Sequence, residues 1–262
     1  MAADKTTITT MKTNAFYAIY ILWLRQIKRY FRSRSRIIGS LGQPLLFLVA
    51  LGFGLQSTFA AAGDGNYIQF LAPGIIGMSI LFTAIFSGIE IIWDRQFGFL
   101  KETLVAPVSR FNIMFGRTLG GATVASFQGV IVLILALLVG FRPDAAMILP
   151  AFGFMILISL VFTALGTGIA SLLDDMQGFQ LIMNFVVMPV FFLSGSLFPL
   201  TSAPTALKIV AMFDPLTYGA DGLRATLTGV STYGAYTDAG VLAVIAIVFL
   251  GIGAWLFSRI KA

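Results

Sequence analysis

The chain has 262 residues, of which 58% are hydrophobic and 11% are charged, and its formal net charge is +6. A soluble globular domain is about 45–50% apolar and about 25% charged, so this composition excludes such a domain and indicates that lipid surrounds most of the chain. Because histidine and cysteine are absent, disulfides, thiolate or imidazole metal ligands, cysteine nucleophiles and a Ser-His-Asp triad are excluded as well.

Residues 1–36 are predicted to form a cytoplasmic N-terminal segment with one amphipathic helix. The short apolar stretch of this segment precedes its strongest basic cluster, which is the reverse of a cleavable signal peptide. Basic residues recur at helical spacing on one face, and aromatic and aliphatic residues occupy the other. We therefore expect a helix in the membrane interface that turns its basic face toward anionic lipid. The residues assigned to this face and its aromatic neighbour are Trp23, Arg25, Lys28, Arg29 and Arg32.

Two alternatives for this segment are a solvated basic tail and a nucleic-acid-binding surface. The interleaved aromatic residues argue against the tail. Lipid phosphate would occupy the basic face beside a membrane span, so we expect no nucleic acid as a partner.

Residues 37–262 are predicted to hold six membrane-spanning helices, because six stretches of about 20 residues are apolar with few charges. The alternating ten-residue pattern of an outer-membrane barrel is absent, so the expected fold class is all-α integral membrane. The predicted spans cover residues 37–57, 70–92, 118–140, 145–173, 179–200 and 240–257.

The distribution of basic residues predicts the orientation of these spans. Of the 17 basic residues, 14 lie in the N-terminal segment, between the second and third spans, or at the C-terminus, Lys5, Lys12 and Lys261 among them. The remaining loops hold only Arg142, Lys208 and Arg224. By the positive-inside rule we expect both termini on the cytoplasmic side, as an even number of spans requires.

Residues 94–107 are predicted to form a short amphipathic helix on the cytoplasmic side, ended by Pro107 and followed by Ser109 as the cap of the next helix. Apolar residues share one face, and the mixed charges suit a protein partner better than a lipid surface. The alternative is a helix that rests on the membrane. The residues expected to contact the partner are Asp94, Phe97, Leu100, Lys101, Glu102 and Leu104.

Residues 199–238 are interrupted by prolines and glycines but are too apolar for a free loop. They are predicted to form two short helices that dip into the outer leaflet, with an ordinary external loop as the alternative. Asp221 and Arg224 are three residues apart, so they are expected to pair on one helix face.

Charges near the ends of the spans are few. Glu90 and Arg117 lie close to the cytoplasmic ends of the second and third spans, where each either faces protein or extends to the interface. No span carries a charge at its middle, which weighs against an ion-coupled carrier. The phosphate-binding pattern G-x-x-x-x-G-K-[ST] is absent, so we expect no cofactor on this chain and any ATP and Mg on another subunit.

Three motifs in this order resemble the membrane permease of type-2 ABC exporters, of the daunorubicin-resistance type. Residues 101–110 (KETLVAPVSR) resemble the coupling-helix segment, and residues 192–199 (FLSGSLFP) resemble the end of the fifth span. Residues 214–224 (DPLTYGADGLR) resemble the N-P-L-T-Y-x-x-D-x-x-R signature, with Asp214 in place of the more frequent Asn. Residues 99–101 depart from the usual Gly-Thr-Leu. The signature residues, which the resemblance assigns to an outer gate, are Asp214, Pro215, Tyr218, Asp221 and Arg224.

The resemblance implies a half-transporter of a bacterial or archaeal inner membrane that is not itself an enzyme. Two copies would pair around a central path and dock on two cytoplasmic ATPase subunits, which would act through residues 94–107. The implied substrate is an amphipathic or apolar drug or lipid, and phenylalanine, with 25 residues, lacks the polar tip that helps to hold sugars. A polysaccharide or lipo-oligosaccharide exporter is the nearest alternative.

Two function classes outside the resemblance were weighed from the residues. A lipid-modifying membrane enzyme is disfavoured by the absence of histidine and cysteine. A passive channel or a membrane assembly factor is the other alternative, and ion conductance without a partner would distinguish it.

Overall fold

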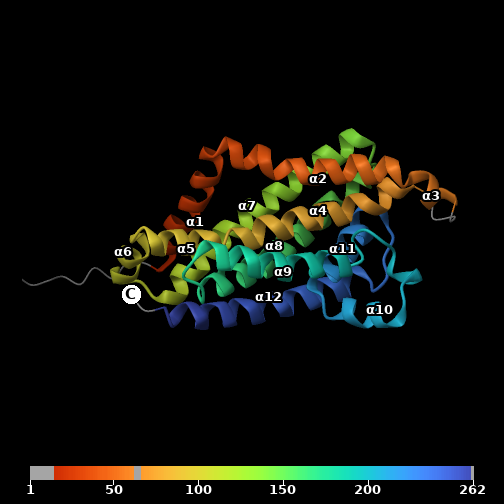
Figure 1. Ribbon diagram of the computed structural model, residues 1–262. Helices are drawn as coiled ribbons and strands as arrows, with labels where there is room; N and C mark the ends of the chain where they lie inside the picture. The colour runs from red at the N-terminus through yellow and green to blue at the C-terminus, as the bar shows by residue number, and fades with distance from the viewer. Residues whose placement is uncertain (1–14, 62–65, 261–262) are drawn as a thin grey trace, which may run out of the picture.

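The computed structural model describes residues 15–61 and 66–260, and within these ranges every regular element is a helix (Figure 1). Two short 3-10 helices, η1 and η2, accompany twelve α-helices in the described part of the chain. In chain order the elements are α1 (Ala15–Arg32), α2 (Arg34–Gly54), α3 (Gln56–Ala61), α4 (Tyr67–Phe86), α5 (Ile89–Gln96), α6 (Phe99–Val105), α7 (Arg110–Val139), η1 (Ala145–Met147), α8 (Ile148–Ala170), α9 (Met176–Leu193), η2 (Leu200–Ser202), α10 (Thr205–Met212), α11 (Pro215–Thr228) and α12 (Ala235–Ser258).

Six helical segments of the described chain are long and apolar enough to cross a membrane, which confirms the predicted number and order of spans. The spans are α2, α4 joined to α5, α7, η1 joined to α8, α9 and α12. The sixth span begins at Ala235 rather than near residue 240, and two other boundaries moved further. The third span begins at Arg110 rather than near residue 118, and the fifth ends at Leu193 rather than near residue 200.

Short polar side chains begin several of these helices by accepting a hydrogen bond from an otherwise unpaired backbone N–H. Ser109 accepts from the Asn112 N–H at the start of α7, as predicted. Asp175 caps α9 in the same way, and Gly140, with φ of 110°, ends α7 in the left-handed conformation that glycine tolerates best.

The helices differ in how far they are enclosed. In the most apolar part of each span, 72% of the residues of α4–α5 are buried, against 17% for α2 and 22% for α9 and α12. Helix α4 therefore forms the centre of the bundle, with α7 and α8 packed against it. Helices α2, α9 and α12 form its outer faces, where their apolar side chains meet lipid or another protein.

Glycines on α7 form the seat for α1. A Cβ atom at Gly116 would lie 3.0 Å from the backbone oxygen of Ile19, and one at Gly120 would lie 2.6 Å from Gln26 side-chain carbons. The small-residue spacing of the α7 sequence thus serves a close contact within the chain.

The bundle has two ends, which Figure 1 shows clearly. The α6 end holds α1, α5, α6 and the last turns of α12, and the α11 end holds α3, α10 and α11. The described segments that are rich in basic residues gather at the α6 end. At the α11 end, Lys208 lies on α10, Arg224 lies on α11, and Arg142 lies beside residues of α11. Lys5, Lys12 and Lys261, which were counted in the orientation, lie outside the described residues.

Helices α10 and α11 confirm two short helices between the fifth and sixth spans and exclude an ordinary loop there. Ten of the 14 residues of α11 are buried, because this helix packs among α4, α8 and α12. Helix α10 instead exposes apolar side chains, for example Ile209 and Met212.

Candidate functional site

Six charged side chains from α1, α2, α5 and α7 meet at the α6 end, and we call them the charge cluster. Its members are Arg25, Arg29, Arg36, Glu90, Asp94 and Arg117.

The two carboxylates of the charge cluster join four helices. Asp94 accepts hydrogen bonds from Arg25 at 3.0 Å and from Arg117 at 2.5 Å. Glu90 accepts from Arg29 at 3.2 Å and from Arg36 at 3.1 Å. Helix α5 is thereby tied to α1, to the start of α2 and to α7, through charge-assisted hydrogen bonds that are stronger than neutral ones.

The centre of the charge cluster is removed from solvent. Asp94 is 1% exposed, Arg117 2% and Glu90 4%, so Glu90 and Arg117 face protein and do not extend to the interface. The Nε and Nη1 atoms of Arg117 are buried without a hydrogen-bond partner in the described part of the chain. Because such groups are costly to leave unpaired, Asp94 is the main compensation for the Arg117 charge.

The structure corrects the prediction that the basic face of α1 points to anionic lipid. Arg25 and Arg29 point to Asp94 and Glu90 instead, and the Trp23 Nε1–H donates to the Thr123 hydroxyl at 3.0 Å. The helix-face pattern identified the basic stripe correctly but carried no information on acidic residues some sixty positions later in the chain. Lys28 and Arg32 are exposed, and for these two residues the lipid-facing orientation stays a prediction.

The segment expected to be one helix over residues 94–107 is divided in two. Helix α5 ends at Gln96, Gly98 adopts a left-handed φ of 80°, and α6 covers Phe99–Val105. Glycine is the residue that adopts this conformation at least cost, so the break follows from the local sequence. The expectation of a single helix was therefore wrong.

The division of the segment changes which side chains are accessible. Asp94 belongs to the charge cluster and Leu100 is 2% exposed in the core, so neither presents itself to a partner as expected. Phe97, with 70% of its surface exposed, and Lys101 and Glu102 are accessible, whereas Leu104 is half-buried against the core. Sequence reasoning did not assign Phe99 and Val105, which are 48% and 82% exposed.

At the opposite end of the bundle, Asp214 and Tyr218 stabilise the turn between α10 and α11. Asp214 accepts from the Leu216 N–H at 2.8 Å, and the Tyr218 hydroxyl donates to the Met212 carbonyl at 2.8 Å. Pro215 occupies the first turn of α11, where its missing N–H costs nothing. Burial raises the pKa of the Asp214 carboxyl to about 7, and the Leu216 N–H partly opposes this rise.

Asp221 holds the loop that follows α11. Its carboxylate accepts from the Ser231 hydroxyl at 3.0 Å and from the backbone N–H groups of Thr232 and Tyr233 at 2.9 Å each. A carboxylate with several N–H donors is well satisfied without a cation.

Arg224 also finds its partners on the backbone. Its guanidinium donates to the carbonyls of Phe70 at 3.2 Å and Gly195 at 2.8 Å, and it lies 3.9 Å from the centre of the Phe70 ring. The expected pair of Asp221 and Arg224 is therefore not formed, because each group is held by a different segment of backbone. Burial lowers the pKa of Arg224 to about 10, which keeps the side chain charged at neutral pH.

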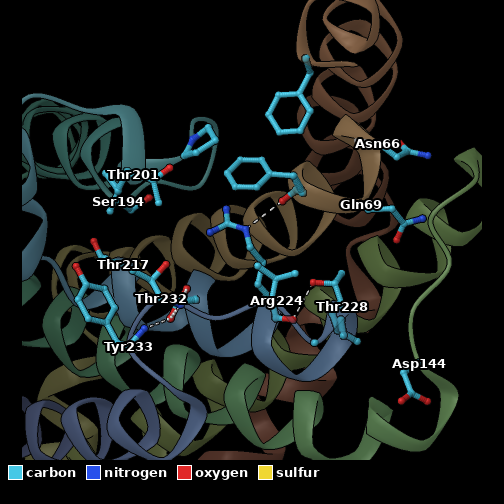
Figure 2. A pocket seen from close by; sticks show the side chains of 18 of the residues that line it. Asn66, Gln69, Asp144, Ser194, Thr201, Thr217, Arg224, Thr228, Thr232 and Tyr233 are labelled. Atoms are coloured by element: carbon cyan, nitrogen blue, oxygen red, sulfur yellow. Dashed lines mark hydrogen bonds between the residues drawn. The ribbon is translucent and has the colours of Figure 1, made fainter. Parts of the chain in front are cut away.

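A cavity of about 560 Å³ lies between α4, α11 and the loops around them, and we call it the α11 cavity. Figure 2 shows Arg224 at its centre, between Thr217 and Tyr233 on one side and Gln69 on the other. Sequence reasoning missed this cavity because its lining comes from stretches far apart in the chain, at residues 59, 66–70, 142–144, 194–201 and 217–233. The lining residues are Phe59, Asn66, Gln69, Phe70, Arg142, Asp144, Ser194, Pro199, Leu200, Thr201, Thr217, Asp221, Arg224, Leu227, Thr228, Gly229, Val230, Thr232 and Tyr233.

A second cavity of about 390 Å³ adjoins the charge cluster, between α1, α2 and α4. Its lining is mixed, with Arg36 and Glu90 beside apolar residues such as Met78 and Phe82. Within the described residues, no group of three or more acidic side chains is arranged to hold a metal ion.

Comparison with known proteins identifies the family of the chain. Residues 17–228 match the model of the ABC-2 type transporter. The chain is 30% identical over 206 residues to a putative transport permease, ycf38, of Cyanophora paradoxa, with 76% of this chain and 71% of that protein covered. It is 29% identical over 216 residues to nodulation protein J of Rhizobium leguminosarum bv. viciae, with 82% and 83% covered.

A third relative extends the match over most of the chain. It is the inner membrane transport permease YadH of Escherichia coli K12, 25% identical over 240 residues, with 88% of this chain and 91% of that protein covered. Together with six membrane-crossing helices in the expected order, these matches show that the chain belongs to the ABC-2 type transporter family, as a membrane permease that works with an ABC ATPase partner.

Proposed function

We propose that this chain is the permease half of an ATP-driven exporter in a bacterial or archaeal inner membrane. Both termini are cytoplasmic, two copies of the chain form the path, and two separate ATPase subunits bind ATP and Mg. The substrate is amphipathic or apolar, a drug or a lipid. The family membership and the inner membrane location in the name of the YadH relative support this proposal.

The observation that carries the proposal is the exposed helix α6 on a buried support. Exposed apolar and charged side chains share this seven-residue helix and the turn before it, among them Phe97, Glu102 and Val105. A short amphipathic helix of this kind fits a groove on a partner protein. The acidic residues of α5, directly before it, are locked into the charge cluster.

The connection between these parts provides a route for movement. Closure of the ATPase subunits would press on α6, and α5 would pass the displacement to α1, α2 and α7 through Glu90 and Asp94. Helix α5 also continues α4, the most enclosed helix, which reaches the α11 cavity at Gln69 and Phe70. The consecutive helices α4 and α5 thus link the cytoplasmic face to the proposed outer gate.

A second copy of the chain fits against the weakly enclosed helices α2 and α9. Both expose large apolar side chains, including Phe53 at 61% and Phe185 at 83%. A paired arrangement with α2 and α9 at the interface would cover these faces.

Two alternatives remain distinguishable by experiment. A polysaccharide or lipo-oligosaccharide exporter would share the same architecture and differ only in the transported molecule. A passive channel or a membrane assembly factor would act without ATP, and conductance of the purified chain in bilayers would identify the channel.

Helix α6 provides the test of the proposed function. The permease and its co-purifying ATPase are reconstituted in liposomes, and ATP hydrolysis and association are compared for the wild type and Val105→Asp. Because Val105 is 82% exposed, we expect the variant to fold normally but to lose at least about tenfold in association, as at an interface hot spot.

Tyr236→Asp is the control for this test, since Tyr236 is 97% exposed and α12 places it at the other end of the bundle. It should leave ATP hydrolysis and association unchanged. Leu100→Asp is unsuitable, because a buried charge at a 2% exposed position would destabilise the fold itself. An intact complex with unaltered ATP turnover in Val105→Asp would refute the coupling role of α6.

A further inference from the structure

The α11 cavity carries a polar stripe on a helix that is otherwise apolar and buried. Thr217, Asp221, Arg224 and Thr228 line the cavity and follow one another at intervals of four, three and four residues. This spacing places all four on one face of α11. Figure 2 shows Thr217, Arg224 and Thr228 beside the cavity. A packed helix interface would not need such a stripe.

The charges around the α11 cavity cancel and are largely satisfied. Its lining holds two basic and two acidic residues, so a charged ligand gains no net attraction. Asp221 and Arg224 are held by backbone groups, and Asp144 accepts from the Ala146 N–H at 3.0 Å. The fourth, Arg142, is exposed. An exposed ion pair contributes little, so a charged headgroup would lose its hydration and gain little from Arg142.

Uncharged hydrogen-bonding groups dominate the remainder of the lining. Side-chain hydroxyls and amides reach the cavity from the start of α4, from the segment after α9, and from α11 with the loop that follows it. The neighbouring rings of Phe59 and Phe70, whose centres are 5.6 Å apart, complete this part of the lining. The residues with hydroxyl or amide groups are Asn66, Gln69, Ser194, Thr201, Thr217, Thr228, Thr232 and Tyr233.

Thr217 shows that this surface is incomplete without a ligand. Its residue is 1% exposed, and its hydroxyl has no hydrogen-bond partner in the described part of the chain, although it lines the cavity. A buried hydroxyl normally finds a hydrogen-bond partner, because leaving it unpaired after its removal from water is unfavourable.

We propose that the α11 cavity binds an uncharged, hydroxyl-rich headgroup, such as a hexose, of an amphipathic substrate. Hydroxyls of the ligand pair with Thr217 and the other hydroxyl and amide groups, and its C–H faces pack on the phenylalanine side of the lining. The volume lies within the range of about 300–1,000 Å³ that is usual for small-molecule sites. The amphipathic source of the headgroup rests on the proposed exporter function, whereas the hydroxyl chemistry rests on the lining alone.

Binding is tested on the full chain in lipid nanodiscs by isothermal titration calorimetry, with empty nanodiscs as the blank. The probes are octyl β-glucoside below its micelle concentration, methyl β-glucoside, and octylphosphocholine, which keeps the chain but carries a zwitterionic headgroup. We expect saturable binding of octyl β-glucoside and none of octylphosphocholine. Equal binding of the two octyl amphiphiles would overturn the proposal.

Thr217→Val is the decisive variant, because valine keeps the shape and removes only the unpartnered hydroxyl. We expect an unchanged or higher Tm and a Kd for octyl β-glucoside raised about 3- to 10-fold, as for the loss of one neutral hydrogen bond. Thr163→Val is the matched control. The Thr163 hydroxyl is also buried without a partner in the described residues, but it lines none of the cavities described above.

An unchanged Kd in Thr217→Val, or equal weakening in Thr163→Val, would overturn the assignment of the site. Methyl β-glucoside binding as tightly as octyl β-glucoside would support the hydroxyl site and refute its amphipathic source. These titrations need no ATPase. A failure here would leave the coupling of α6 intact, and a failure of that coupling would leave the titrations unaffected.

Discussion

The α6 end and the α11 end both bury charged side chains, but they neutralise them in different ways. In the charge cluster, two carboxylates on α5 are shared among four guanidinium groups from three other helices. At the α11 end, Asp221 and Arg224 do not form an ion pair with each other. Asp221 binds backbone N–H groups and Arg224 binds backbone carbonyl groups.

The charge cluster suits a movable connection between helices, whereas the backbone contacts of Asp221 and Arg224 suit a fixed arrangement of loops. Arginines that share two carboxylates can exchange partners when helices shift, so the charge cluster suits a place where α5 moves against α1, α2 and α7. Backbone groups hold one charge in one position, and Asp221 and Arg224 thereby fix the loops that surround the α11 cavity. The same residue types thus suit relative movement of helices at the α6 end and a fixed loop geometry at the α11 end.

The largest expected effect comes from breaking the charge cluster at its centre. Asp94→Ala would leave the buried Arg117 without its only ion-pair partner in the described chain, and we expect a loss of about 3–5 kcal/mol in the free energy of unfolding. Thermal unfolding of the purified permease, followed by tryptophan fluorescence, measures this change.

Asp174→Ala is the control at the same end of the molecule. Asp174 pairs with Arg95, but its side chain is 88% exposed, so its loss should cost less than about 1 kcal/mol. Equal losses in the two variants would mean that burial does not distinguish the charge cluster from a surface ion pair.

Arg224→Lys should give the second largest effect, about 1.5–3 kcal/mol of destabilisation. Lysine keeps the charge but lacks the planar fork that reaches two carbonyls while stacking on the Phe70 ring. Arg142→Lys, at an exposed position on the same cavity, should leave Tm unchanged. An unchanged Tm in Arg224→Lys would show that the positive charge alone holds these segments in place.

Asp214→Asn should give the smallest effect, and it should depend on pH. The folded chain binds the Asp214 proton more tightly than the unfolded chain, since the pKa rises from 3.8 to about 7. The stability that this proton contributes is complete below pH 4 and is lost as the pH rises toward 7. Asparagine keeps the cap on α11 and carries no charge, so we expect the variant to be more stable than the wild type by about 1–2 kcal/mol at pH 8 and no different below pH 4.

Asp144→Asn is the control for this pH dependence. Asp144 caps η1 with the same geometry but is exposed. Thermal unfolding between pH 4 and 8 should show no pH-dependent gain for Asp144→Asn. A flat difference between Asp214→Asn and the wild type over that range would contradict a raised pKa.

Much of the fold was predictable because local sequence is sufficient for it. Apolar length predicted the six spans, Ser109 predicted the start of α7, and prolines and glycines predicted the short pieces that became α10 and α11. Gly98 was the signal that α5 and α6 separate, and the expectation of one helix overlooked it.

The partners of the charged residues were harder to predict. Arg25 and Asp94 are 69 positions apart, and Arg224 reaches the Phe70 carbonyl across 154 positions. Asp221 and Arg224 are three residues apart on a helix, which favoured an ion pair between them. In the structure each binds a loop backbone instead, Arg224 at Gly195 and Asp221 at Thr232. The abundance of phenylalanine likewise argued against sugars, whereas the lining of the α11 cavity is rich in hydroxyl groups.

The sequence by itself determined that the chain is an integral membrane protein, how many spans it has, their approximate positions, and that no histidine or cysteine chemistry is available. Only the tertiary structure decided what lies opposite each charged face: acidic α5 for the basic stripe of α1, backbone for Asp221 and Arg224, and a cavity for the polar stripe of α11. The physical reason is that apolar length and helical period are properties of neighbouring residues, whereas the partner of a buried charge is chosen by helix packing across the whole chain.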